Sequence, residues 1–329
     1  MKARAFWVTG PGVGEIKTEA IDDPADEEIR VRTLYSGVSR GTETLVFQGR
    51  VPASQHQRMK CPFQVGQFGQ AVKYGYISVG RVESDGDLAG RNVVCLHPHQ
   101  DRYVVPRSAV TVLPEGFDPA MAVLAPNMET AVNGVWDCRP QRGDRVTVIG
   151  AGVVGALVAW RMQAEVDHPV QLVDLQPSRA GIAEALGLSF STPADAWTER
   201  NLVVHASGSP AGLRRALELA GDDGRIVEMS WFGDRQIELP LGEAFHSRRL
   251  TIQCSQVGAL PPHMRDSMDF TGRMRVVLDA LSGHPELRVL INSEGSFESL
   301  PQTMKRLAEG APEVLCHRVR YQETDPCTD

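Results

Sequence analysis

The sequence has 329 residues, of which 42% are apolar and 23% charged, with a net charge of −7. This length favours about two domains over a single core. Charges of both signs are interspersed and no apolar run reaches the roughly 18 residues of a membrane helix, which argues against nucleic-acid and membrane partners.

Residues 1 to about 120 are predicted to be rich in β-strands. Short apolar or alternating runs are separated by Gly, Pro and Asp, as is typical of strands joined by turns: EIRVRTLY, YISVGRVES, RNVVCL, RYVVP and AVTVLP.

From about residue 141 the pattern changes to alternating strands and helices. Predicted strands are RVTVIG, QLVDL, NLVVHAS, GRIVEMSW and LTIQCSQVG, with helices at VVGALVAWRMQAE, SRAGIAEALGL and about 210–220. This order predicts a doubly wound parallel α/β sheet. A further helix is expected at about 266–282, followed by a short strand-rich tail whose last residues, 321–329, are expected to fray.

The strongest motif is GAGVVG at residues 150–155, with glycines at Gly150, Gly152 and Gly155 and with Val153 and Val154 between the last two. It follows a predicted strand, opens a helix and is followed by an acidic residue, Asp174, at the end of the next strand. These are the features of a Rossmann dinucleotide site, in which the pyrophosphate lies at the helix N-terminus. Asp174 would accept hydrogen bonds from ribose hydroxyls and repel a 2′-phosphate, so NAD is favoured over NADP, although Arg179 could soften that preference.

The order of a β-rich segment followed by a Rossmann unit resembles the medium-chain dehydrogenase/reductase superfamily. Within it, SGVSRGTE, FQGRVP, GYISVGRV and PHQDRYVVP resemble the hydroxyethyl bacteriochlorophyllide a dehydrogenase branch. The resemblance implies a GroES-like catalytic domain at 1–122 and 265–329, and a Rossmann domain at 123–264. It also implies further cofactor contacts at Ser207, Gly208, Ser255 and Val257.

The zinc ligands of that superfamily are missing here. Ser39 or Arg40 fills the position of the cysteine ligand, Tyr76 and Ile77 replace His and Glu, and the third ligand falls near Pro126. The side chains of Ile77 and Pro126 have no donor atom, and those of Ser39 and Tyr76 are poor zinc ligands. Cys95, His97 and His99 could share one face of a strand, but no second cluster completes a tetrahedral set, so no zinc is expected.

Without zinc, an ionisable side chain must serve as acid or base at the substrate oxygen. Tyr76 is the first candidate, with Lys73 or Arg40 expected to lower its pKa; the alternative is a half-buried strand tyrosine. His99 is the second, against the alternative of a plain loop histidine. Thr42 matches a proton-relay hydroxyl of zinc members, and Glu43 follows it. Further candidates are Glu129, near the nicotinamide or in a helix cap, and Arg40, as a cation holding an alkoxide or in a surface ion pair.

The sequence therefore predicts a zinc-independent NAD(H)-dependent enzyme that interconverts a small-molecule secondary alcohol and a ketone. A zinc-free quinone or enone reductase and a non-catalytic dinucleotide-binding protein are the alternatives. The six cysteines are scattered without a C-x-x-C pair, which predicts reduced thiols and a cytoplasmic location. A homodimer is expected through residues 250–258, as in the superfamily.

Overall fold

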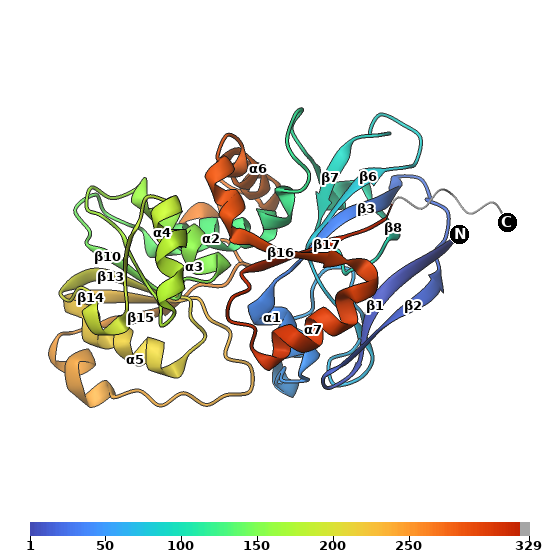
Figure 1. Ribbon diagram of the computed structural model, residues 1–329. Helices are drawn as coiled ribbons and strands as arrows, with labels where there is room; N and C mark the ends of the chain where they lie inside the picture. Colours follow the sequence, from blue (N-terminus) through green and yellow to red (C-terminus); the bar gives the residue numbers. More distant parts are fainter. Residues whose placement is uncertain (323–329) are drawn as a thin grey trace. The chain divides into compact units, whose positions relative to one another are not determined.

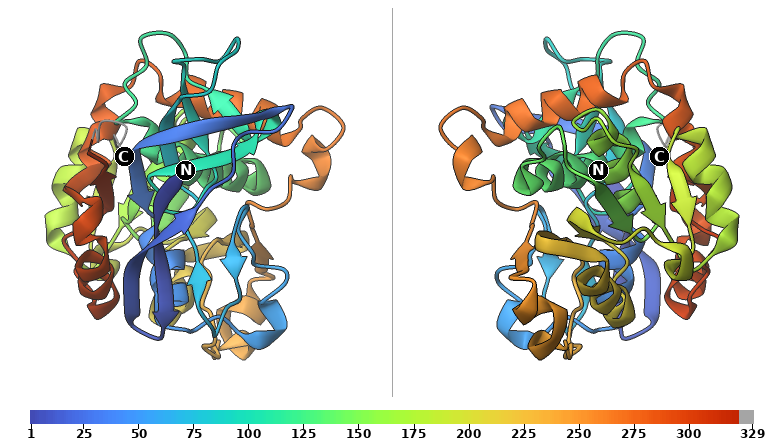
Figure 2. Two further views of the ribbon diagram at one scale, coloured as in Figure 1. Left: turned by 90° about the vertical axis from the view of Figure 1, so that its right-hand side faces the viewer. Right: turned by 90° about the vertical axis from the view of Figure 1, so that its left-hand side faces the viewer.

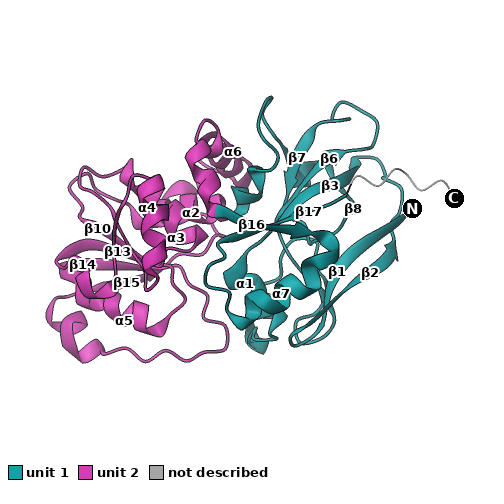
Figure 3. Cartoon of the chain, in the orientation of Figure 1, with its two compact units in different colours: residues 1–126, 291–329 teal, residues 127–290 magenta. Residues whose placement is uncertain are grey.

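The computed structural model describes residues 1–322 and divides into two compact units (Figure 3). Unit 1 comprises Met1–Pro126 and the chain from Ile291 onwards, and unit 2 comprises Asn127–Leu290. The predicted return to the first domain at residue 265 therefore differs from the structure, in which it comes at 291. Of the segment expected to fray, residues 323–329 lie outside the described part.

Unit 1 is β-rich, as predicted. Within residues 1–322 its smaller sheet has the order β2-β1-β5-β4, and its larger sheet the order β16-β17-β3-β6-β7-β9, with β8 paired to β3. The long hairpin of β1 and β2 is blue in Figure 2. The strands are β1 (Lys2–Gly10), β2 (Val13–Ala20), β3 (Glu28–Val38), β4 (Val65–Gly66), β5 (Val72–Lys73), β6 (Ser78–Val82), β7 (Asn92–Cys95), β8 (Arg102–Pro106), β9 (Val110–Val112), β16 (Ile291–Ser296) and β17 (Cys316–Arg320).

Alternate side chains of β3 in the larger sheet of unit 1 are buried in a hydrophobic core. Ile29 and Val31 of β3 point into a core that also contains Val82, Val93 and Tyr103. Because successive strand residues face opposite sides, this alternation identifies the buried face directly. Helix α1 (Arg40–Phe47) follows β3 immediately.

The chain after residue 291 contains a helix that the sequence analysis did not predict. Helix α7 (Leu300–Glu309) buries Leu300, Met304 and Leu307, which repeat at helical spacing. The helix has only ten residues, and most of those between its buried apolar positions are polar. The expected strands are present as β16 and β17, and α7 lies between them.

Unit 2 contains the predicted parallel sheet. Within the described chain it has the order β12-β11-β10-β13-β14-β15, and every pairing in it is parallel (Figure 1). The elements are α2 (Ala125–Cys138), β10 (Val146–Ile149), α3 (Val153–Gln163), β11 (Gln171–Val173), α4 (Ala180–Ala185), β12 (Ser189–Ser191), β13 (Arg200–His205), α5 (Pro210–Leu219), β14 (Ala220–Glu228), β15 (Thr251–Cys254) and α6 (Phe270–Leu281). Strand β10 is buried throughout, as expected when helices cover both faces of a sheet.

Helix α6 belongs to unit 2 because a buried ion pair ties it to α2. Nε and Nη2 of Arg273 donate to Oε1 of Glu129 at 3.1 and 2.9 Å, and Nη1 donates to Oδ1 of Asn133 at 2.5 Å. Arg273 is 2% exposed and Glu129 5% exposed. A buried charge requires its partner, so this pair stabilises the packing of α6 on α2 within unit 2.

Across residues 1–322, no helix combines the length and apolar character needed to cross a membrane. Cys61, Cys95, Cys138, Cys254 and Cys316 are free thiols.

Candidate active site

The glycine turn predicted from the sequence lies at the carboxyl end of β10. Gly150 has φ +107°, and a Cβ on it would lie 2.7 Å from the backbone of Ser207. A Cβ on Gly155 would lie 1.9 Å from the carbonyl oxygen of Gly150. A side chain at either position would therefore prevent the close approach of β10, α3 and the end of β13.

The N-terminus of α3 is open to a ligand. Gly152 precedes the helix in an extended conformation, no side chain caps the helix, and a Cβ on Gly152 would meet nothing within 4 Å. Val153 and Val154 form the first turn and are half-buried. Unsatisfied N–H groups at a helix N-terminus bind phosphate, so this segment fits the pyrophosphate of a dinucleotide.

Asp174 lies beside the glycine turn. Its Oδ2 accepts a hydrogen bond from the N–H of Ala151 at 2.8 Å, and its Oδ1 accepts one from the N–H of Gln176 at 2.9 Å. Each carboxylate oxygen has a second lone pair, so the group can still accept from ribose hydroxyls. Arg179 is 7% exposed. The structure therefore brings together the glycines and the acidic residue that the motif predicted.

A buried network joins the ends of β13 and β14. Nε2 of His205 lies 2.6 Å from Oγ of Ser207, and Nδ1 lies 2.7 Å from Oε2 of Glu228. His205 is fully buried, whereas Ser207 is exposed. The histidine and glutamate therefore hold the Ser207 hydroxyl at the edge of the sheet that carries the glycine turn.

The other predicted cofactor contacts follow the same two strands and β15. The N–H of Gly208 donates to Oγ of Ser230 at 3.0 Å, and Oγ of Ser255 donates to Oδ2 of Asp137 at 2.6 Å. Val257 is half-buried in the loop after β15. The carboxyl ends of parallel strands meet at one edge of a sheet, which is the usual ligand side of this fold.

Unit 1 contains a second buried network, centred on His99 and Glu43. Nε2 of His99 lies 2.8 Å from Oε2 of Glu43, and Nδ1 lies 2.7 Å from Oγ of Ser36, which lies 3.1 Å from the Tyr321 hydroxyl. Oε1 of Glu43 accepts from the N–H of Ser39 at 2.7 Å. Glu43 thus orders the loop, and it also holds a histidine whose two ring nitrogens are both occupied.

Tyr76 lies beside this network but is only half-buried. Burial and the negative charge of Glu43 raise the pKa of its phenol, and hydrogen bonding by the side chains of Ser39 and Thr42 lowers it only in part. The expectation that Lys73 or Arg40 lowers this pKa was wrong. Nζ of Lys73 pairs with Glu19 and donates to Oε1 of Gln100 at 2.8 Å.

The remaining candidates have structural partners. Nη1 of Arg40 donates to the carbonyl oxygen of Val314 at 3.0 Å. Glu129 is paired with Arg273 in the core of unit 2. Its pKa is raised because burial outweighs the attraction of Arg273, which favours a structural role over a catalytic one.

The residues present do not fit a catalytic zinc. Ile77 is fully buried and has no donor atom, and His97 stacks on Tyr103 with ring centroids 3.8 Å apart. Across the described chain, no three His, Cys, Asp or Glu side chains converge in a way that could hold a metal. Structural zinc sites use four such ligands and catalytic sites three.

Several members of the two networks were not identified from the sequence as site residues. Ser36, Tyr321, Glu228 and Ser230 come from strands or chain ends distant in sequence from their partners. A single polar residue in a strand carries no local signal of its partner. Only the pairing of β3 with β17, and of β13 with β14, brings these groups together.

The parallel sheet with its glycine turn, together with a β-rich unit, defines the fold of medium-chain, alcohol dehydrogenase-like oxidoreductases. No family model matches the sequence. The chain is 27% identical to 2-dehydro-3-deoxy-L-galactonate 5-dehydrogenase of Pseudoalteromonas atlantica, with 87% of this chain and 92% of that protein covered. It is 24% identical to 2-desacetyl-2-hydroxyethyl bacteriochlorophyllide A dehydrogenase of Rhodobacter capsulatus, over 69% of this chain and 73% of that one.

The match to L-threonine 3-dehydrogenase of Bacillus velezensis has 24% identity and is shorter, covering 50% of this chain and 54% of that protein. Among solved structures, an alcohol dehydrogenase of E. coli CFT073 complexed with NADH has a TM-score of 0.76 at 17% identity, over 97% of this chain and 99% of that one. A zinc-binding-type dehydrogenase of Sinorhizobium meliloti bound to NADP also has a TM-score of 0.76, at 15% identity and the same coverage. In sequence and fold, the chain is therefore similar to medium-chain, alcohol dehydrogenase-like oxidoreductases.

Proposed function

We propose that this protein is a zinc-independent, NAD(H)-linked oxidoreductase that interconverts a secondary alcohol and a ketone. The observation that carries the proposal is the half-buried phenol of Tyr76. The resemblance to zinc members predicts a ligand position at Tyr76, and the phenol lies in the field of Glu43, which is paired with His99 in the interior of unit 1. The relatives named above are dehydrogenases of hydroxyl-bearing substrates, which supports the class of reaction.

A nicotinamide dinucleotide would supply or accept the hydride when bound. The open N-terminus of α3 would hold its pyrophosphate, and Asp174 would hold its adenosine ribose. A carboxylate at that position repels a 2′-phosphate, which favours NAD over NADP. The similar solved structures include one complex with NADH and one with NADP. The fold alone therefore does not select the cofactor, and the proposed preference for NAD rests on Asp174.

Tyr76 is proposed to exchange the proton at the substrate oxygen. Its raised pKa keeps the phenol protonated at neutral pH, so it can donate a proton to the oxygen of a ketone as hydride reaches the carbon. In alcohol oxidation the phenolate would take that proton back. Thr42 and Ser39 hydrogen-bond this phenol and would polarise it.

Glu43 and His99 are positioning residues in this scheme, not groups that touch substrate. His99 is 1% exposed and Glu43 is 2% exposed. Their pair fixes the loop of Ser39 through its N–H. Ordering that loop orients the hydroxyl groups around Tyr76. This orientation matters because even a small displacement of a catalytic group lowers the rate.

The proposal is tested by assaying a panel of secondary alcohols and ketones with NAD(H), alongside quinones and enones. Turnover of an alcohol–ketone pair by metal-free protein is the expected result. Turnover confined to quinones or enones would replace the proposal with C=C reduction, which needs less help at the oxygen. Tight NAD(H) binding with no turnover on any member of the panel would favour a non-catalytic dinucleotide-binding protein.

We also propose a homodimer formed through β15. This strand lies at one end of the parallel sheet and three of its four residues are exposed. An edge strand presents unpaired backbone N–H and C=O groups to a second copy. Light scattering at micromolar concentration should give twice the mass of 36.0 kDa, and a monomeric mass would refute the dimer.

A further inference from the structure

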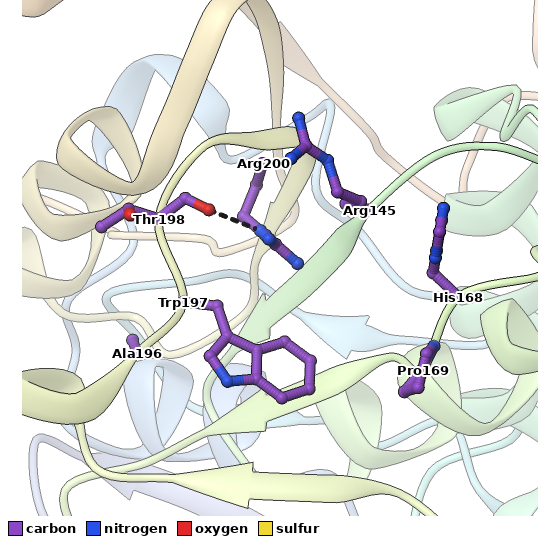
Figure 4. Close-up of a pocket in the computed structure, with 7 residues that line it drawn as sticks. All are labelled: Arg145, His168, Pro169, Ala196, Trp197, Thr198 and Arg200. Carbon is purple, nitrogen blue, oxygen red and sulfur yellow. Dashed lines mark hydrogen bonds between the residues drawn. The ribbon is translucent and has the colours of Figure 1, made fainter.

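A cavity of about 560 Å³ lies at the edge of the parallel sheet opposite the glycine turn. It is lined by Arg145, His168, Pro169, Ala196, Trp197, Thr198 and Arg200 (Figure 4). Arg145 directly precedes β10, and Arg200 is the first residue of β13. Gly150 and Ser207 follow the same two strands at their other ends, so this cavity is separate from the dinucleotide site.

Within residues 1–322, the two arginines of the cavity form side-chain hydrogen bonds through Nε, and their terminal nitrogens form none. Nε of Arg145 donates to Oδ1 of Asn201 at 3.2 Å, and Nε of Arg200 donates to the carbonyl oxygen of Thr198 at 2.9 Å. Within residues 1–322 neither guanidinium forms an ion pair with a carboxylate. An anion could therefore bind both groups without displacing a carboxylate.

Nearby carboxylates are already paired with other arginines. Oδ1 of Asp167 lies 3.0 Å from Nη1 of Arg142, and Oε1 of Glu199 lies 2.7 Å from Nη1 of Arg248. The cavity therefore keeps an uncompensated positive charge. The pKa of Arg200 is lowered, first by burial and then by repulsion from Arg145, and Glu199 offsets this only in part.

A planar surface lies next to the charge. The guanidinium carbon of Arg200 lies 5.5 Å from the centre of the Trp197 ring, and Trp197 is 39% exposed (Figure 4). His168, on the far side of the cavity in Figure 4, is also exposed. Exposed indole and guanidinium groups together favour a ligand that carries both a flat ring and an anionic group.

We propose that this cavity binds a small phosphorylated ligand with a planar ring, of the nucleoside monophosphate class, at a site distinct from the dinucleotide site. Arg145 and Arg200 would bind the phosphate, and Trp197 would stack against the ring. The volume of the cavity admits a ring, a sugar and a phosphate together. This inference does not depend on the proposed function, since the residues involved take no part in the dehydrogenase site.

The test is calorimetric titration of the whole chain with uridine monophosphate. A parallel titration contains saturating NADH. If uridine monophosphate bound at the dinucleotide site, NADH would compete with it and weaken its binding. Uridine monophosphate should bind under both conditions. Uridine and inorganic phosphate should each bind at least roughly tenfold more weakly, because each lacks one half of the recognition.

The variants localise the binding. Arg145→Gln and Arg200→Gln should each weaken uridine monophosphate roughly tenfold or more, the scale of a lost charge-assisted hydrogen bond, and Trp197→Leu should also weaken it. The matched control is Arg306→Gln, which removes an exposed arginine of unit 1 that pairs with Glu313 and should leave binding unchanged. Unaltered thermal unfolding of the variants would exclude a folding defect.

A second measurement uses the unaltered chain. The indole N–H resonance of Trp197, assigned by its loss in Trp197→Phe, should shift on addition of uridine monophosphate. The proposal is overturned if no binding occurs at millimolar ligand, if the Arg145→Gln/Arg200→Gln double variant binds as tightly as the unaltered chain, or if NADH abolishes the binding.

Discussion

His99 and Glu43 form a buried pair, with Nε2 of the histidine 2.8 Å from Oε2 of the glutamate. The pair joins the loop between β7 and β8 to the first turn of α1. Glu43→Gln keeps the size of the side chain but removes its charge. It should lower kcat by roughly 10–100-fold with KM nearly unchanged, which corresponds to losing one charge-assisted hydrogen bond behind the site.

The control for this variant is Glu15→Gln, which changes an exposed glutamate of the same unit that pairs with Lys17. Partial recovery of kcat in Glu43→Asp would support the requirement for a carboxylate. A rise in KM without a fall in kcat would instead mean that the pair serves substrate binding alone.

Tyr76→Phe should lower kcat by roughly 10²–10⁴-fold, the usual share of general acid–base catalysis. Since burial and Glu43 raise the pKa of Tyr76, the phenol stays protonated below its ordinary value of about 10. Ketone reduction should therefore keep a constant kcat from about pH 6 to pH 9, whereas alcohol oxidation should rise with pH over that range.

Tyr74→Phe is the matched control, because this tyrosine precedes Tyr76 by two residues and is 5% exposed. It should leave both pH profiles unchanged. An inflection near pH 6.5 that persists in Tyr76→Phe would point to a histidine as the acid or base, and the role proposed for Tyr76 would be wrong.

Asp174→Asn should weaken NAD(H) binding by roughly 1–3 kcal/mol, because charge-assisted hydrogen bonds to the ribose are lost. Binding of NADPH should improve relative to NADH, since the repulsion of the 2′-phosphate is removed. Fluorescence titration measures both affinities, with the exposed Asp167→Asn as control. Tighter binding of NADPH than of NADH by the unaltered chain would contradict the assignment.

Elemental analysis of the purified protein should find far less than one zinc per chain. The reason is the side chains at the ligand positions, of which Ile77 has no donor and Tyr76 is a protonated phenol. Incubation with a chelator should leave kcat unchanged. Stoichiometric zinc whose removal abolishes activity would refute metal independence.

Glu129→Gln should destabilise the protein by about 3–5 kcal/mol, because it leaves the buried charge of Arg273 without its partner. The free energy of unfolding is measured by denaturant titration. Asp167→Asn breaks the exposed pair with Arg142 and should have little effect. Lost activity in Glu129→Gln with unchanged stability would restore the catalytic role considered for this residue.

The glycine turn could be predicted from the sequence because its determinants are local. Gly150, Gly155 and Asp174 occur at the ends of consecutive predicted elements, and the structure places them together at one sheet edge. The strand–helix alternation of unit 2 was visible for the same reason, since parallel strands are buried on both faces and appear as continuous apolar runs. Helix α7 was missed because its apolar stripe is short and interrupted by polar residues.

The acid–base region could not be predicted in the same way. The sequence by itself predicted that the zinc ligands of related dehydrogenases are replaced, because the motifs that carry them are short and continuous. Only the tertiary structure decided that Glu43 holds His99, that Tyr76 has a raised pKa and that Glu129 is bound to Arg273. These properties depend on burial and on partners distant in sequence. A charged or polar side chain has no defined pKa or role until packing determines which groups surround it.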